Sequence, residues 1–203
     1  AMAAAPALKL SLSALRADEL LQDVKFIFDS GETLGAHRCV LALHSSVFRS
    51  WFDPSCEWCS TSKRVQEVRL PQKAASDFDS LLCYFYSSDV SVVSEHTATS
   101  LLMLAEEYQV WALKAACEGW LVDQVDAATC VECLLLASTY RCDKLEAVCK
   151  EMLVQQFEGC SGSEAFSLLP AQLLIDALQC DHLCVSSEET VFQACVRWRE
   201  GQR

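Results

Sequence analysis

Glycine and proline are scarce in this sequence, with only six glycines and four prolines among 203 residues. This scarcity, together with a hydrophobic fraction of 52%, excludes a disordered or low-complexity chain and indicates a helix-rich globular protein. A chain of this length forms one large domain or two small ones, with enough apolar side chains to build a core.

Long hydrophobic runs are also absent. The longest apolar stretches, such as SLLMLA (100–105) and CLLLA (133–137), are far shorter than the roughly 20 residues that span a membrane. The N-terminal stretch AMAAAPAL is apolar but lacks the basic residues that open a signal peptide. We therefore expect a cytoplasmic protein, with the nucleus as the alternative location.

No cluster of lysine and arginine stands out. The net charge is −12, and it is spread evenly: residues 1–125 hold 10 basic and 16 acidic residues, and residues 126–203 hold 6 and 12, so each part carries −6. Nucleic acids and anionic membranes are bound by clustered basic side chains. We therefore expect neither as a partner.

Catalytic motifs are missing as well. The sequence has no glycine-rich phosphate loop, no GxSxG nucleophile turn and no HExxH zinc motif. Its four histidines are scattered, and His37 and His44 lie seven residues apart on one helical face, where capping or packing is the expected role. The sequence predicts neither an enzyme nor a cofactor.

Cysteine, in contrast, is abundant: there are 13, an odd number without a disulfide framework. The pairs Cys56/Cys59 and Cys130/Cys133 have the spacing of zinc ligands, but they lie far apart in sequence and the second pair opens a helical pattern. Free cysteine packs as a small hydrophobic residue. We expect core cysteines without zinc or disulfides, and a four-cysteine zinc site is the alternative.

The first 125 residues predict a small sheet with helices. Residues 24–28 and 32–36 flank the turn DSG as a β-hairpin, and 65–70 alternates like a strand. Residues 37–52 carry helical apolar stripes. Further helical segments are predicted at 75–88, 97–108 and 110–122.

From Asp126, a plausible N-cap, the pattern is helical throughout. The predicted segments are 126–140, 143–157, 164–168, 171–178 and 187–200, with a loop at 158–163. Ser186 and Glu189 have the spacing of a capping box for the last helix.

The stretch DVKFIF…GAHRCVLALHSSVFRSWF resembles the opening of a BTB (POZ) domain. The matching positions are Asp23, Val24, Phe26, Ala36, His37, Val40, Leu41, Ala42, Ser45, Phe48 and Phe52. LLCYFYSSDVSV is similar to the helix of that fold that runs into a tyrosine-containing turn, with Tyr86 as the tyrosine. The segment LLMLAEEYQVWALKAACEGWL resembles its closing helical pair.

The later region resembles the BACK domain that follows BTB in kelch-like proteins. Its pattern D-L-x-V-x-S-E-x-x-V-F-x-A-x-x-x-W is matched by Asp181, Leu183, Val185, Ser187, Glu188, Val191, Phe192, Ala194 and Trp198. The resemblance implies an α+β BTB domain at 1–125 and the first, all-α part of BACK at 126–203. It also implies that the sequence stops partway through BACK, so that a substrate-binding domain, as a rule a kelch propeller, lies beyond Arg203.

The resemblance implies a function in assembly: homodimerisation through BTB and docking of cullin-3, as the substrate adaptor of a ubiquitin ligase. For the dimer interface it implies an amphipathic helix within 8–22, carrying Leu12, Leu15 and Leu20 or Leu21. Asp23 and Arg38 match a buried charged pair near that interface. The alternative is that the N-terminal helix covers only its own sheet.

For cullin-3, the family carries a hydrophobic–x–Glu element six residues after the phenylalanine that matches Phe52. Here the element reads Cys56–Glu57–Trp58, so Trp58 occupies the position of the acid and Glu57 lies one place early. The expected contact surface combines this element with the turn around Tyr86 and the early BACK helices. The alternative function is a cytoskeletal or transcriptional BTB–BACK scaffold that does not bind cullin-3.

Overall fold

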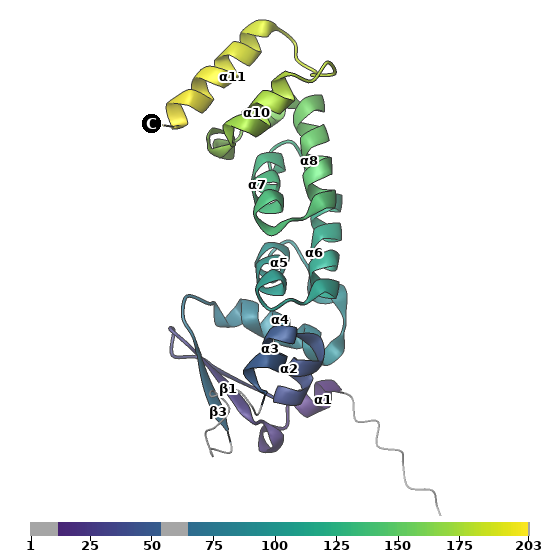
Figure 1. The fold of residues 1–203 in the computed structure, drawn as a ribbon, viewed down its shortest axis with the longest axis vertical. Coiled ribbons are helices and arrows are strands. Elements are labelled where there is room, and N and C mark those ends of the chain that lie inside the picture. The colour runs from purple at the N-terminus through teal and green to yellow at the C-terminus, as the bar shows by residue number, and fades with distance from the viewer. Residues whose placement is uncertain (1–11, 54–64, 203) are drawn as a thin grey trace, which may run out of the picture. The chain divides into compact units, whose positions relative to one another are not determined.

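The computed structural model describes residues 12–53 and 65–202 and divides the chain into two compact units, Ala1–Ala116 and Cys117–Arg203 (Figure 1). The division falls inside α6 (Trp111–Gln124). The fold class predicted from the sequence is confirmed: a small sheet with helices is followed by an all-helical region.

The sheet of the first unit has three strands in the order β2-β1-β3, namely β1 (Val24–Phe28), β2 (Thr33–Ala36) and β3 (Gln66–Leu70). β1 pairs with β2 in antiparallel register and with β3 in parallel register. The predicted hairpin is therefore confirmed. Gly31 in its turn has φ +85°, a left-handed conformation that glycine adopts without steric cost.

Aromatic side chains join this sheet to its helices. The helices of the first unit are α1 (Leu12–Arg16), α2 (Arg38–His44), α3 (Ser46–Trp51), α4 (Ala75–Ser87), α5 (Ala98–Glu107) and the start of α6, with 3-10 turns η1 (Glu19–Leu21) and η3 (Val90–Val92). Phe26 of β1 contacts Phe48 of α3 and Phe78 of α4, at ring-centroid distances of 5.9 and 4.7 Å. Phe48 lies at the centre of this core.

The segment 37–52, predicted from its helical stripes, divides into two helices at Ser45. Ser45 has extended backbone angles, and its hydroxyl accepts a hydrogen bond from the Phe48 N–H at 3.1 Å. The same hydroxyl donates to the carbonyl of Tyr108 at 2.6 Å. A capping serine thus ends one helix and starts the next without changing the apolar pattern.

The single amphipathic helix predicted within 8–22 is not formed in the described part of that segment. Residues 12–22 contain only the five-residue α1 and the turn η1. The Arg16 guanidinium at the end of α1 contacts Asp79 and the Cys83 sulfur of α4. α1 therefore packs on a helix of its own unit.

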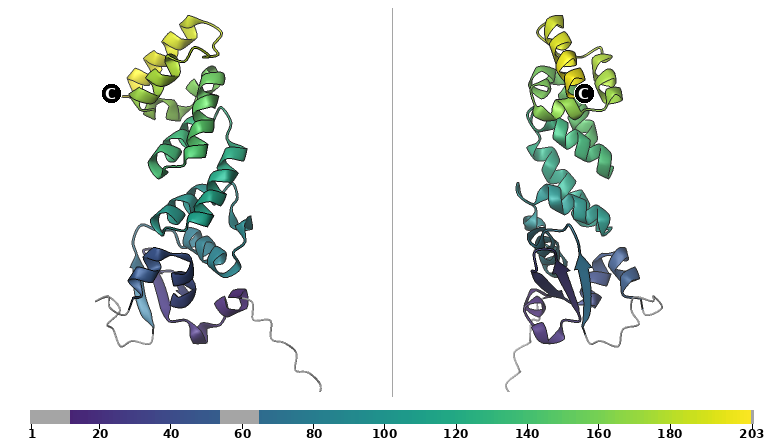
Figure 2. Two further views of the ribbon diagram at one scale, coloured as in Figure 1. Left: turned by 45° about the vertical axis from the view of Figure 1, so that its right-hand side comes forward. Right: turned by 90° about the vertical axis from the view of Figure 1, so that its left-hand side faces the viewer.

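The second unit consists of the end of α6, α7 (Cys130–Tyr140), α8 (Asp143–Gln155), α9 (Phe157–Ser161), η4 (Glu164–Leu168), α10 (Ala171–Leu178) and α11 (Glu188–Gly201). α7 and α8 lie side by side (Figures 1 and 2). The predicted start at Asp126 is four residues early, because the Asp126 carboxylate caps a turn by accepting the Thr129 N–H at 2.9 Å. The predicted loop at 158–163 contains most of α9, which buries Phe157 and Cys160.

The last helix begins at a different serine from the one predicted. Ser187, not Ser186, is the N-cap of α11, and its hydroxyl accepts the Thr190 N–H at 3.3 Å. The Ser186 N–H donates to Glu158 instead, at 2.5 Å. The Trp198 indole N–H donates to the Leu169 carbonyl at 2.7 Å, which fixes α11 against the end of η4.

Eleven cysteines lie among the described residues, and all have free thiols. Five of them, Cys117, Cys130, Cys142, Cys149 and Cys160, are buried. Within 12–53 and 65–202, no three His, Cys, Asp or Glu side chains are placed to hold a metal ion. Cys56 and Cys59 lie outside the described residues, so the absence of zinc from the protein stays a prediction. None of the helices described is long and apolar enough to cross a membrane.

Candidate protein-interaction site

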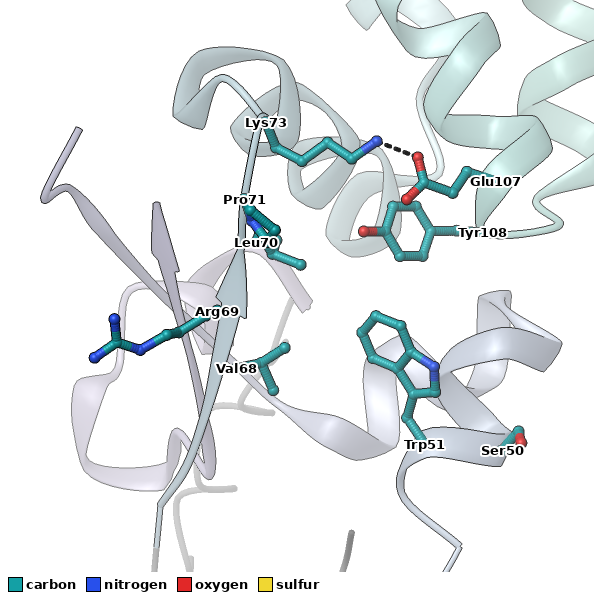
Figure 3. Close-up of a pocket in the computed structure, with 9 residues that line it drawn as sticks. All are labelled: Ser50, Trp51, Val68, Arg69, Leu70, Pro71, Lys73, Glu107 and Tyr108. Carbon is teal, nitrogen blue, oxygen red and sulfur yellow. Dashed lines mark hydrogen bonds and ion pairs between the residues drawn. The ribbon is translucent and has the colours of Figure 1, made fainter. Parts of the chain in front are cut away.

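A pocket of about 400 Å³ opens on the first unit between the end of α3, the end of β3 and the end of α5 (Figure 3). It is lined by Ser50, Trp51, Val68, Arg69, Leu70, Pro71, Lys73, Glu107 and Tyr108. Most of this lining is apolar. β3 pairs with β1 in parallel, and its end lines the pocket together with Trp51 at the end of α3 (Figure 3).

The aromatic wall of the pocket is fixed by the core behind it. The Tyr108 ring stacks on Phe48, with a centroid distance of 4.7 Å and an interplanar angle of 9°. Trp51 meets Tyr108 at 5.9 Å and 82°, an edge-to-face arrangement. Two perpendicular rings therefore form a corner that faces the pocket.

The rim of the pocket carries one ion pair, and two residues that neighbour its lining in sequence have left-handed backbone conformations. Lys73 bonds Glu107 across the opening (Figure 3). Gln72 and Gln109 have φ angles of 59° and 55°, a left-handed conformation that is uncommon outside glycine. Such strain persists only where the surrounding structure holds it in place.

A second aromatic side chain is exposed close by in sequence. Trp111, the first residue of α6, is 58% exposed, and Lys114 lies over its ring at 5.8 Å from the centroid. Lys114 also bonds Glu106 of α5 at 2.6 Å. Exposed tryptophans of this kind are favoured anchors in protein interfaces.

The predicted cullin-3 element lies outside the described residues, since Cys56, Glu57 and Trp58 all fall within 54–64. The chain on both sides of that segment is described. Trp51 ends α3 before that segment and β3 begins after it, and both elements line the pocket. The pocket is thus the described surface that is nearest to the element along the chain.

Tyr86, the fourth residue expected at the cullin-3 surface, is buried. It is 3% exposed, and its hydroxyl accepts the His37 backbone N–H at 2.9 Å and lies 2.6 Å from His37 Nδ1. Burial raises the pKa of Tyr86 to about 12. The Tyr86 side chain therefore joins α4 to the start of α2, and only the turn that follows it is available for contact.

The residues expected at the dimer interface are placed as follows. Leu12 is exposed and Leu15 is half-buried, whereas nothing is described of the Leu20 side chain. Asp23 accepts the Arg38 N–H at 2.7 Å and pairs with Arg38 Nε at 3.1 Å. The ion pair is thus formed within one chain and half-buried, and its place in a dimer interface stays a prediction.

Comparison with known proteins places these features in a family. A model of the BTB/POZ domain matches residues 12–125, and a model described as BTB And C-terminal Kelch (BACK) matches residues 130–203. The predicted boundary at 125/126 lies between these two ranges, whereas the compact units divide at 116/117, so this boundary stays a prediction.

Kelch-like protein 21 of Homo sapiens is 32% identical over 187 residues, which cover 92% of this chain and 30% of that protein. Kelch repeat and BTB domain-containing protein 8 of Danio rerio is 29% identical over 189 residues, 93% of this chain and 31% of that protein. The chain thus spans about 30% of the length of these relatives.

Among solved structures, the BTB domain of zebrafish PATZ1 matches with a TM-score of 0.46 and 22% identity, over 56% of this chain and 86% of that one. The family assignment rests on the sequence matches. The BTB model covers more than half of the chain, and the BACK model follows it directly. The chain therefore belongs to the BTB/POZ family, with a BACK region after its BTB domain as in kelch-like proteins.

Proposed function

We propose that this chain is the assembly module of a cullin-3 ubiquitin-ligase adaptor. It dimerises through its BTB domain, docks cullin-3, and acts in the cytoplasm or nucleus beside a further domain that binds the substrate. The observation that carries the proposal is the succession of a BTB match and a BACK match in one chain. Kelch-like BTB–BACK proteins are generally non-enzymatic adaptors, which agrees with the absence of catalytic motifs from the sequence.

The surface around the pocket supports docking at this place. Half-buried Trp51 at the end of α3 contacts Tyr108, and exposed Trp111 begins α6 three residues after Tyr108. The Cys56–Glu57–Trp58 element follows Trp51 by a few residues in sequence. A few aromatic anchors carry most of the free energy of a protein interface. The scaffold alternative is favoured by one observation, the tryptophan at position 58 where the family carries an acid.

Dimerisation is the first expected result. Light scattering at micromolar concentration should return twice the chain mass of 22.5 kDa. Leu12 and Val90 are 46% and 54% exposed, so Leu12→Lys and Val90→Lys make a matched pair. Leu12→Lys should shift the measured mass toward the monomer, because burying a charge in an apolar interface costs binding free energy. Val90→Lys should leave the mass unchanged. A monomer mass for the unmodified chain at high concentration would contradict dimerisation.

Cullin-3 docking is the second expected result. Titration calorimetry with the cullin-3 N-terminal domain should give saturable heat at tens of micromolar, with one cullin domain per chain. Trp111→Ala should weaken binding by about tenfold, roughly 1.4 kcal/mol, because it removes an exposed aromatic anchor. Phe192→Ala is the control, since Phe192 is 64% exposed on α11 of the second unit. Equal losses in both variants would show that cullin-3 does not dock on the surface around the pocket of the first unit.

A further inference from the structure

The pocket of the first unit has the properties of a small-molecule site as well as of an interface. Its volume of about 400 Å³ lies within the range of roughly 300–1,000 Å³ that is typical of ligand pockets. Trp51, Val68, Leu70 and Pro71 give it apolar walls. Such sites bind their ligand mainly through apolar contact, and a few polar groups orient the ligand.

The polar group here is the hydroxyl of Tyr108. Tyr108 is 1% exposed, and its ring is held by Phe48 on one face and by the edges of Trp51 and Phe78. Its hydroxyl points toward the pocket (Figure 3), and none of the residues described forms a hydrogen bond with it. Burial raises the pKa of Tyr108, so the hydroxyl keeps its proton.

The Tyr108 hydroxyl is not one of the buried side-chain atoms that lack a partner among the described residues, so water reaches it from the pocket, and a ligand acceptor takes the place of that water. The ring cannot turn away to find another partner, because it is stacked on Phe48 at 4.7 Å. The hydroxyl is therefore a preorganised donor at a fixed place in the pocket.

The charges on the rim select a neutral ligand. Lys73 and Glu107 neutralise each other across the opening, and the guanidinium of Arg69, the other charged residue of the described lining, points away from the pocket (Figure 3). An anionic ligand would have to draw Lys73 away from Glu107, and a cationic ligand would have to draw Glu107 away from Lys73. Either exchange breaks one ion pair to form another, so a charge on the ligand contributes little binding free energy.

The rim is also held in shape. The Gln72 N–H donates to the Asp29 carboxylate at 2.8 Å, and the Gln109 side chain accepts a hydrogen bond from Ser46. These bonds hold Gln72 and Gln109, which follow the lining residues Pro71 and Tyr108 in sequence. A site that is formed before binding avoids the entropic cost of ordering it.

We propose that this pocket binds a small, neutral, flat aromatic molecule that carries one hydrogen-bond acceptor. Its ring packs into the corner between Trp51 and Tyr108, against Val68 and Leu70, and its acceptor accepts a hydrogen bond from the Tyr108 hydroxyl. This site goes beyond the proposed function, and it is tested on the chain alone, so its failure is distinct from a failure of cullin-3 docking.

Four probes of similar size test the proposal: acetophenone, toluene, benzoate and benzylamine. Each is titrated into the isotope-labelled chain, and the indole N–H signal of Trp51 is followed by NMR, identified by its loss in Trp51→Phe. Acetophenone should shift this signal with a dissociation constant of about 1 mM or lower. Benzoate and benzylamine, which are charged at neutral pH, should bind at least about fivefold more weakly.

Tyr108→Phe removes the hydroxyl and keeps the stacked ring. It should weaken acetophenone binding about fivefold, the effect of one neutral hydrogen bond, and leave toluene binding unchanged within about twofold. Trp111→Ala, outside the pocket, should bind every probe as the unmodified chain does. The proposal is overturned if no probe shifts Trp51 saturably up to about 10 mM, or if Tyr108→Phe binds acetophenone as tightly as the unmodified chain. Equal losses for acetophenone and toluene would also overturn it, because Tyr108 would then act only by shaping the fold.

Discussion

Replacing Phe48 by alanine is expected to lower the free energy of unfolding of the first unit by about 3–5 kcal/mol. Phe48 is fully buried, and its ring contacts Phe26 of β1, Phe78 of α4 and Tyr108 beyond α5. The substitution removes these contacts and leaves a cavity that helices on several sides cannot fill.

Chemical denaturation, followed by tryptophan fluorescence and by near-ultraviolet circular dichroism, measures this loss. Phe48→Leu fills most of the cavity and should cost about 1–2 kcal/mol, which keeps the test readable if the alanine variant does not fold. Phe192→Ala is the matched control at an exposed site and should change the unfolding free energy by no more than about 0.5 kcal/mol. A loss below about 1 kcal/mol for Phe48→Ala would show that this ring is not the centre of the core.

The sheet could be predicted from the sequence because its signals are local. Val24, Phe26 and Phe28 alternate with more exposed residues, and Gly31 stands where the turn needs a left-handed residue. β3 has the same alternation, with Val68 and Leu70 buried. That β3 pairs in parallel with β1 is set by the packing of the helices between them, which no local pattern encodes.

Helix boundaries were predicted less well, because several residues compete for one cap. Ser186 and Ser187 can both cap a helix by residue type. Glu158, 28 residues earlier, binds the Ser186 N–H and leaves Ser187 to cap α11. Likewise, Ser45 divides the predicted helix 37–52 because Tyr108 fixes its hydroxyl. These choices are made by tertiary contacts that the sequence pattern does not show.

The candidate site was missed for a similar reason. Its lining comes from three separate stretches, around Trp51, Leu70 and Tyr108. Taken by itself, each stretch has the sequence pattern of an ordinary core or loop segment. Gln72 and Gln109, which neighbour the lining in sequence, have left-handed backbone conformations. The sequence does not indicate these conformations, since glutamine has no preference for them. Tyr86 was expected at a surface, whereas its partner His37 lies 49 residues away and holds it in the core.

Trp58 decides between the adaptor and the scaffold, and its substitutions are expected to change cullin-3 affinity strongly. Trp58 occupies the position where the family carries an acid, so we expect it to replace a charged contact by buried aromatic area, which contributes up to a few kcal/mol. Trp58→Ala should therefore weaken binding of the cullin-3 N-terminal domain at least tenfold, about 1.4 kcal/mol.

Trp58→Glu restores the acid of the family and should bind cullin-3 as tightly as the unmodified chain or more tightly. Titration calorimetry measures both variants, and light scattering and the melting temperature are the controls, which should stay nearly unchanged because the position is expected to contact only the partner. Trp111→Ala provides a second aromatic truncation on the same proposed surface for comparison.

If the unmodified chain gives no heat at tens of micromolar while Trp58→Glu binds, the tryptophan blocks docking rather than supporting it. The protein is then a BTB–BACK scaffold, and the adaptor function is wrong.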